Sequence, residues 1–168
     1  KMKKHLLLSL FSALLIVFGI PLVGIGQIAY NGFEEDAGDT WTATFSTAPC
    51  TNGADSWDYR TDLSTLDPPP AGSQFWGITD LNGNCGGTGF ESITFATTNV
   101  SAYTGVTIAF DYKVIGFDNN DDFKYEVFED GTGQGEVVFV DGSSNLNAGW
   151  STITINVTPG TTTVGFKL

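Results

Sequence analysis

The chain has 168 residues, 41% of them hydrophobic, and a formal net charge of −12 at pH 7. So acidic a chain repels nucleic-acid phosphates, because binding to them depends on Lys and Arg displacing counterions. The single histidine, His5, lies in the leader described below, which excludes Ser-His-Asp catalysis, Cys-His catalysis and imidazole zinc sites from the rest of the chain.

The first 26 residues have the organisation of a secretory signal peptide. A lysine-rich head precedes an apolar run from Leu6 to Val23, and glycines lie at the −3 and −1 positions of a cut before Gln27. A membrane anchor is the alternative, because the run approaches the ~20 residues that span a bilayer. Pro21 and the small-residue exit favour cleavage. We therefore expect residues 27–168 to be secreted or displayed at the cell surface, without membrane contact.

Short segments with alternating apolar residues follow one another through the rest of the chain, and none has the period of a long helix. The clearest is 106–114, where Ile108, Phe110 and Tyr112 alternate with polar or small residues. Turn signals such as Asp130-Gly131 separate the segments. The expected strands, in chain order, are 27–34, 40–45, 56–60, 74–79, 90–95, 106–114, 123–128, 135–140, 150–157 and 163–168.

About ten short strands, each with one polar face, predict an all-β domain. Two antiparallel sheets packed face to face, a β-sandwich of the jelly-roll type, are the natural arrangement. Residues 27–168 suffice for one such domain with its own core. The last alternating segment continues to Leu168, so we expect a C-terminally truncated domain that lacks its final strand.

Two cysteines, Cys50 and Cys85, are present. In an exported chain a lone pair most simply forms one disulfide. In the chain-entropy model a loop of this length stabilises the fold by roughly 3–4 kcal/mol. The alternative is two independent free thiols.

The segment 80–91 has the ligand spacing of an EF-hand calcium loop, with side-chain oxygens at the first, third, fifth and twelfth positions. Cys85 occupies the sixth position, where an EF-hand needs glycine, and the flanking segments are strand-like. The segment is therefore not an EF-hand. Asp80 remains a candidate ligand of another calcium site, and a glycine-rich connection with Asx turns is the alternative. A second acidic cluster, 118–122, is another candidate calcium site, and a solvated hairpin tip is the alternative.

Exposed aromatic side chains could stack on a sugar, although most tryptophans of a sandwich lie in its core. Trp57 and Tyr59 have the most polar neighbours, Asp58 and Arg60. We expect Trp57, Tyr59 and Arg60 to be the first candidates for ligand binding. The spacing of acidic residues found in laminarinase-like hydrolases is absent from the sequence, and paired carboxylates are what glycoside hydrolysis needs.

Three stretches carry a resemblance to a known family: "AGSQFWGITDLNGNCGGTGFESITF", "VTIAFDYKVIGFDNNDDFKYEVF" and "GWSTITINVTPGTTTVGFKL". Residues 28–168 resemble the jelly-roll accessory modules of secreted Bacteroidota-type proteins, which are similar to carbohydrate-binding and galactose-binding-like sandwiches. Such modules occur beside extracellular nucleases and adhesins. The resemblance implies a module without catalytic activity and a structural calcium ion near Glu34 and Asp39. The family's closing strand, with its acidic residue, is not found here.

The sequence thus predicts a secreted, non-catalytic binding or adhesion module whose ligand is a glycan, a polysaccharide or another cell-surface partner. Two alternatives stay open: a structural spacer in a larger exported protein, and the accessory domain of an extracellular hydrolase or nuclease encoded beyond residue 168. In either case we expect further domains in the same chain. The candidate calcium ligands are Glu34, Asp39 and Asp80.

Overall fold

A computed structural model describes residues 26–34, 38–53, 55–61, 69–79, 85, 90–117, 121–142 and 146–168, without the side chains of 116 and 146–148. These residues form strands and loops and contain no helix, so no helix among them could span a membrane. The strands are β1 (Ala43–Phe45), β2 (Cys50–Asn52), β3 (Asp55–Arg60), β4 (Phe75–Thr79), β5 (Ile93–Asn99), β6 (Thr107–Phe117), β7 (Asp122–Glu129), β8 (Thr132–Gly133), β9 (Val137–Asp141), β10 (Leu146–Asn156) and β11 (Thr163–Lys167). The predicted all-β fold is confirmed.

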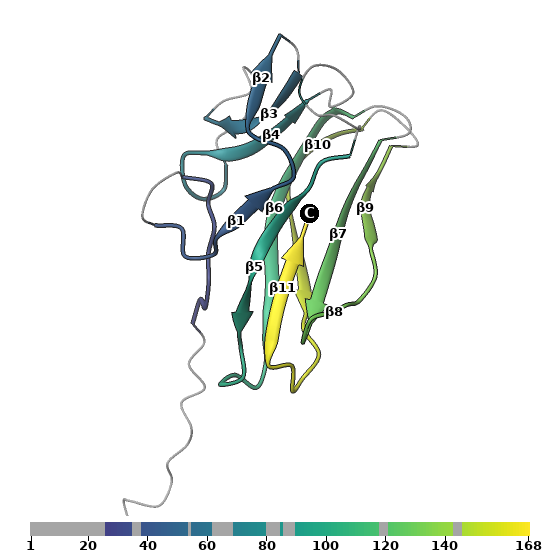
Figure 1. Cartoon of the computed structure of the whole chain (residues 1–168). Helices are drawn as coiled ribbons and strands as arrows, with labels where there is room; N and C mark the ends of the chain where they lie inside the picture. Colours follow the sequence, from purple (N-terminus) through teal and green to yellow (C-terminus); the bar gives the residue numbers. More distant parts are fainter. Residues whose placement is uncertain are drawn as a thin grey trace, which may run out of the picture.

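The larger layer is a six-stranded antiparallel sheet in the order β1-β5-β11-β7-β8, with β9 also paired to β7 (Figure 1). Its register pairs Phe45 with Ile93 and Phe95 with Phe166. Directly paired residues point to the same face of a sheet. These apolar side chains therefore form one inner face.

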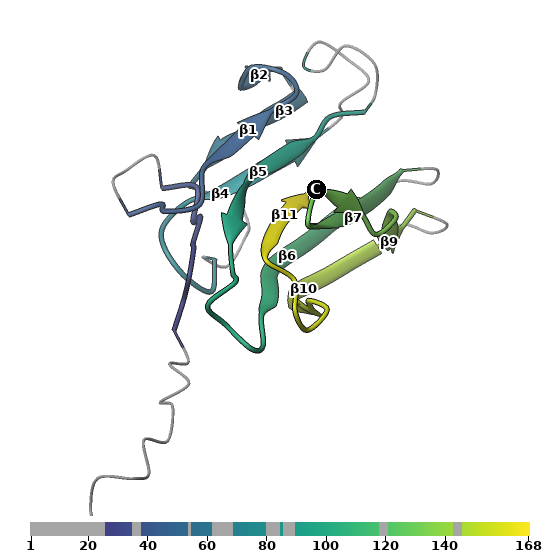
Figure 2. The ribbon, with the colours of Figure 1, turned by 60° about the horizontal axis from the view of Figure 1, so that its bottom comes forward.

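The second layer consists of two separate antiparallel sheets, β2-β3-β4 and β10-β6. The ring of Phe45 on β1 stacks on Trp76 of β4 at 4.0 Å, and Phe110 of β6 meets Phe166 of β11 at 5.5 Å. Both small sheets therefore cover the same inner face of the larger sheet, and Figure 2 shows the two layers nearly edge-on. The molecule is the two-layer β-sandwich that the sequence predicted.

The alternation predicted for 106–114 is present in β6. Ile108 and Val114 are buried, whereas Thr107, Ala109 and Asp111 are exposed. On the paired strand β10, the inward residues from Ile153 onward likewise alternate with exposed polar ones. A strand with one buried and one wet face produces this pattern.

Residues 27–34, predicted as a strand, do not form one. The carbonyl of Tyr30 accepts hydrogen bonds from the amides of Thr40 and Trp41, so the segment closes a loop on itself. Phe33 has a φ of 57°, in the left-handed region that a strand cannot contain. The strand prediction is wrong here because the alternation reflects Ile28 and Phe33 packing onto the core from a loop.

The predicted Asp130-Gly131 turn joins β7 to β8. Both residues have positive φ, 49° and 79°, which corresponds to a type I′ hairpin turn. The Asp130 carboxylate also accepts hydrogen bonds from the amides of Thr162 and Thr163, each at 2.9 Å. The hydroxyl of Thr162 and these two amides lower the pKa of Asp130. One side chain thus fixes two neighbouring turns.

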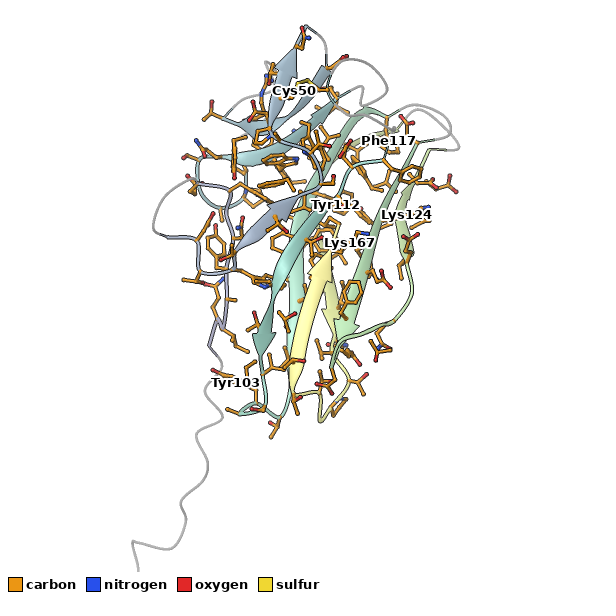
Figure 3. All side chains as sticks on the ribbon, in the orientation of Figure 1. Cys50, Tyr103, Tyr112, Phe117, Lys124 and Lys167 are labelled. Atoms are coloured by element: carbon orange, nitrogen blue, oxygen red, sulfur yellow. A yellow bond between two sulfur atoms is a disulfide. The ribbon has the colours of Figure 1, made fainter. Side chains whose placement is uncertain are left out.

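Cys50 and Cys85 form the predicted disulfide, with a Cα–Cα distance of 5.6 Å. Cys85 is buried and Cys50 begins β2, near the top of the molecule in Figure 3. The bridge fixes the small sheet β2-β3-β4 to the connection that leads into β5 of the larger layer.

Candidate ligand-binding cleft

A cavity of about 970 Å³ lies between the two layers, and we call it the cleft. Its walls are formed by residues 26–33, 74–79 and 105–115, and its floor by inward side chains of β5 and β11. Tyr103 and Phe117 both line the cleft and lie at opposite ends of the molecule (Figure 3). The cleft therefore extends along the whole of β6, and its volume is in the range of small-ligand sites.

Aromatic rings make up much of the cleft wall. The rings of Phe75, which begins β4, and Trp150 of β10 meet edge to face at 6.1 Å. Tyr112 of β6 and Trp76 of β4 contribute further rings, and both are only half-buried. Rings of both small sheets of the second layer thus line the cleft.

Few charges reach the cleft. Among the described residues that line it, the charged ones are Arg60, Asp111 and Lys113. Arg60 and Lys113 are two of the four basic residues that follow the leader, in a chain with 19 acidic residues. The lining is therefore positive on balance in a molecule that is negative overall.

Two polar atoms in the cleft wall, Gln74 Oε1 and Trp76 Nε1, are buried and have no hydrogen-bond partner among the described residues. Gln74 and Trp76 are two positions apart where the chain enters β4, so their side chains point to the same side. One atom is an acceptor and the other a donor. A buried polar atom without a partner costs roughly 1–3 kcal/mol.

Glu34 fixes the approach to Gln74. Its carboxylate accepts hydrogen bonds from the amide and hydroxyl of Ser73, at 2.5 and 2.7 Å, and from the Gln74 amide at 2.9 Å. The Ser73 hydroxyl, followed by these two amides, lowers the pKa of Glu34. Gly72, with a φ of 76°, lets the chain turn around the carboxylate, where a larger side chain would collide with Glu34. Glu34 therefore ties the loop at 26–34 to the edge of the cleft.

Of the three predicted calcium ligands, Glu34 and Asp39 lie in the described part of the chain, and each accepts hydrogen bonds from the backbone. Asp39 accepts a hydrogen bond from the Gly32 amide at 2.6 Å, and Glu34 binds the 73–74 segment. Asp80 lies outside the described residues, as do 118–120 of the second acidic cluster. No group of three acidic, histidine or cysteine side chains suited to a metal occurs within the described ranges. Calcium binding stays a prediction.

Trp57 lies in the core, so its predicted role as an exposed ligand platform is wrong. It exposes 1% of its surface, and its indole nitrogen donates a hydrogen bond to the Thr47 carbonyl at 3.1 Å. Its polar neighbours Asp58 and Arg60 do not indicate exposure, because all three residues lie on β3 and successive side chains of a strand point to opposite faces. Trp57 points inward on that strand and meets the ring of Phe45 edge to face at 6.5 Å.

Tyr59 and Arg60 are both half-buried, and they differ in their relation to the cleft. Tyr59 packs against the rings of Phe45 and Trp76 but does not line the cleft. Arg60 lines it, and its Nη1 lies 3.5 Å from Ser56 Oγ. Of the three predicted ligand residues, Arg60 alone reaches the cavity.

Sequence reasoning missed Gln74, Phe75 and Trp150 as a group. Trp76 and Trp150 stand out as aromatic residues, but 74 positions separate them, and the arrangement of the two small sheets that brings β4 near β10 leaves no local signal. Comparison of the chain with protein-family models, curated proteins and solved structures found no match. The resemblance to jelly-roll accessory modules therefore rests on the sequence motifs.

Proposed function

We propose that the protein is a secreted, non-catalytic binding module that takes a carbohydrate in the cleft, at the end formed by Arg60, Gln74, Phe75, Trp76 and Trp150. The observation that carries this proposal is the pair of unpartnered atoms, Gln74 Oε1 and Trp76 Nε1, in an aromatic wall. A sugar hydroxyl both donates and accepts, so hydroxyls of one ring match this acceptor and donor. Sugar rings also present apolar faces that fit aromatic side chains.

The absence of a catalytic role in this proposal follows from the acidic residues of the cleft. Asp111 is the one carboxylate among the described residues that line it. Glycoside hydrolysis uses two, held about 5–5.5 Å apart for retention and farther apart for inversion. A binding module needs no such pair.

Affinity electrophoresis through gels that contain soluble polysaccharides tests the proposal. Residues 27–168 should be retarded by at least one polysaccharide of a broad panel, and Trp150→Ala should reduce the retardation strongly. Removing one stacked ring costs about 1–2 kcal/mol, which corresponds to roughly tenfold in affinity.

Phe90→Ala is the matched control, because Phe90 is an exposed aromatic residue, 74% accessible, that does not line the cleft. It should leave the retardation unchanged. Loss of binding in Phe90→Ala but not in Trp150→Ala would move the ligand site to the outer surface and overturn the cleft assignment. If no polysaccharide retards the protein, the structural spacer becomes the better interpretation.

A further inference from the structure

The cleft is bounded by two strand edges that lack partners within the described residues. β4 pairs only with β3, and β6 pairs only with β10. Residues 75–79 and 105–115 line the cleft without a break, although alternate residues of β6 have exposed side chains on the outer face. Those outward residues can reach the cleft only through their backbone. The edges themselves, and not only the inner faces, therefore form the walls.

The hydrogen-bond register shows which backbone groups of β6 face the cleft. The amide of Val157 donates to the Val106 carbonyl at 3.0 Å, in continuation of the pairing of Thr107 with Asn156. Hydrogen-bonded and non-bonded pairs alternate along an antiparallel ladder. Val106, Ile108 and Phe110 thus direct their amides and carbonyls toward β10. Thr107, Ala109 and Asp111 direct their amides and carbonyls toward the cleft.

β4 and β6 do not pair with each other, and they lie on either side of the cleft. No Cα atom of β4 comes within 8 Å of a Cα atom of β6. Neighbouring strands lie about 4.8 Å apart, so two strands that flank a third are about 9–10 Å apart. In Figure 1 β4 lies obliquely across the upper part of the molecule and β6 runs steeply upward, so a strand antiparallel to β6 would lie at an angle to β4. It would also complete a six-stranded second layer opposite the six-stranded first.

We propose that the cleft accepts one extended polypeptide strand from a partner protein, which pairs with the free edge of β6. Its inward residues should be apolar at every second position, because they would face the rings of the cleft. An acidic residue should lie near Arg60, a cation of the lining. A second copy of this chain is disfavoured as the occupant by the net charge of −12. Strand addition to a sheet edge is an established mode of peptide recognition, and this inference does not depend on carbohydrate binding.

The test uses residues 27–168 and a synthetic nine-residue peptide with valine at alternate positions, threonine between them and one terminal aspartate. A scrambled peptide of the same composition is the control for alternation. Amide hydrogen exchange should slow about tenfold or more at Thr107, Ala109 and Asp111 on addition of the alternating peptide, and not with the scrambled one. Equal protection by both peptides, or protection at no β6 amide, would overturn the proposal.

Ala109→Pro removes an amide that faces the cleft and leaves the hydrogen bonds to β10 in place, since proline is tolerated on a free strand edge. Thr154→Pro is the matched control, because Thr154 lies directly opposite Ala109 on β10 and its amide faces the other edge. Ala109→Pro should weaken peptide binding about tenfold, and Thr154→Pro should leave it within about twofold. Equal effects of the two variants would overturn the proposal.

Should Ala109→Pro fail to fold, a peptide with alternate N-methylated residues takes its place on the unaltered protein. N-methylation of every second residue removes the peptide donors that face β6 when it falls on either the odd or the even positions, and that peptide should no longer protect the β6 amides. If the odd-methylated and the even-methylated peptide both still bind, strand pairing is contradicted. Analytical ultracentrifugation without peptide tests whether a second copy of the chain occupies the cleft. A dimer whose β6 amides are already protected, and which Ala109→Pro dissociates, would replace the partner strand with a second copy.

Discussion

The two halves of the second layer differ in how completely one of their own aromatic side chains is buried. Under β3 and β4, the rings of Phe45, Trp57, Tyr59 and Trp76 contact one another, and Trp57 is 1% exposed. Along β6, Tyr112 and Phe117 stay half-buried and line the cleft. Both halves have alternating strands rich in aromatic residues, so composition does not explain the difference.

The number of strands in each small sheet accounts for this difference in burial. Three strands cover one part of the inner face, whereas β10 and β6 alone cover the other, and the space between β4 and β6 stays open. Trp57 on β3 is buried beneath the three-stranded sheet, whereas Tyr112 and Phe117 on β6 border the open space. The unpartnered atoms of Gln74 and Trp76 lie at the boundary, in the wall of the cleft. The covered half should therefore carry the stability and the open half the binding.

Trp57→Ala and Trp150→Ala would measure this division directly. Trp57→Ala removes a fully buried ring and its hydrogen bond to Thr47, so we expect a loss of about 3–5 kcal/mol in the free energy of unfolding. Because Trp150 is only half-buried in the cleft wall, Trp150→Ala should lower the free energy of unfolding by about 1 kcal/mol. Urea denaturation followed by tryptophan fluorescence provides both values. Equal losses would show that the two halves are packed alike.

Opening the disulfide should have the next largest effect. Cys50→Ala with Cys85→Ala releases a constraint between residues 35 positions apart, which we expect to lower the free energy of unfolding by about 2–4 kcal/mol. The loss should appear first as faster amide exchange in β2, β3 and β4, while β6 and β10 keep their protection. A uniform loss of protection across all strands would mean that the covered half has no separate stability.

Acid should weaken the edge of the cleft through Glu34. Its pKa is lowered in the folded protein, so the stability that it contributes is complete above the unfolded pKa, about 4.3, and is lost as the pH falls through the folded value. We expect the free energy of unfolding to decrease between about pH 5 and pH 2, and Glu34→Gln to make this decrease smaller.

Asp130→Asn is the companion variant, because the pKa of Asp130 is lowered at a turn outside the cleft. At neutral pH, Glu34→Gln should speed amide exchange at Ser73 and Gln74, whereas Asp130→Asn should speed it at Thr162 and Thr163. Exchange that changes at both places in both variants would show that the cleft edge and the turn are coupled.

The smallest effect is expected on the solvent face of the open half. Thr152 donates a hydrogen bond to Asp111 at 2.5 Å across the β10–β6 pair, and both side chains are exposed. Thr152→Val should change the free energy of unfolding by less than about 0.5 kcal/mol, because substitutions of exposed residues usually have effects this small. Thermal unfolding followed by circular dichroism checks this. A large loss would indicate that the outer face is itself covered in the native protein.

The strands could be predicted because each has its own signal in the sequence. In β6, Ile108 and Thr107 reveal by alternation which face is buried, and the Asp130-Gly131 dipeptide marks its turn. The segment 27–34 contains apolar residues that pack on the core, but the hydrogen bonds to the Tyr30 carbonyl and the positive φ of Phe33 make it a loop. Two cysteines allow only one disulfide within the chain.

The cleft could not be predicted in the same way, because it depends on which strands are neighbours. Nothing local distinguishes Trp57, which is buried, from Trp150, which lines the cleft. The free edge of β6 is a property of pairing between distant segments, and its exposed residues Thr107 and Ala109 have the composition of any solvent face. Arg60 was chosen for its aromatic neighbours, yet it reaches the cleft because β3 lies beside β4.

The disulfide also determines how the molecule would respond to mechanical load. Under tension applied through the chain ends, the segment between Cys50 and Cys85 cannot lengthen, since the force passes through the sulfur atoms. At about 3.4 Å per extended residue, the 35-residue separation withholds roughly 120 Å of contour from stretching. A pulled molecule would thus extend the segments on either side of the bridge, while β2, β3 and β4 stay within the loop that the bridge closes.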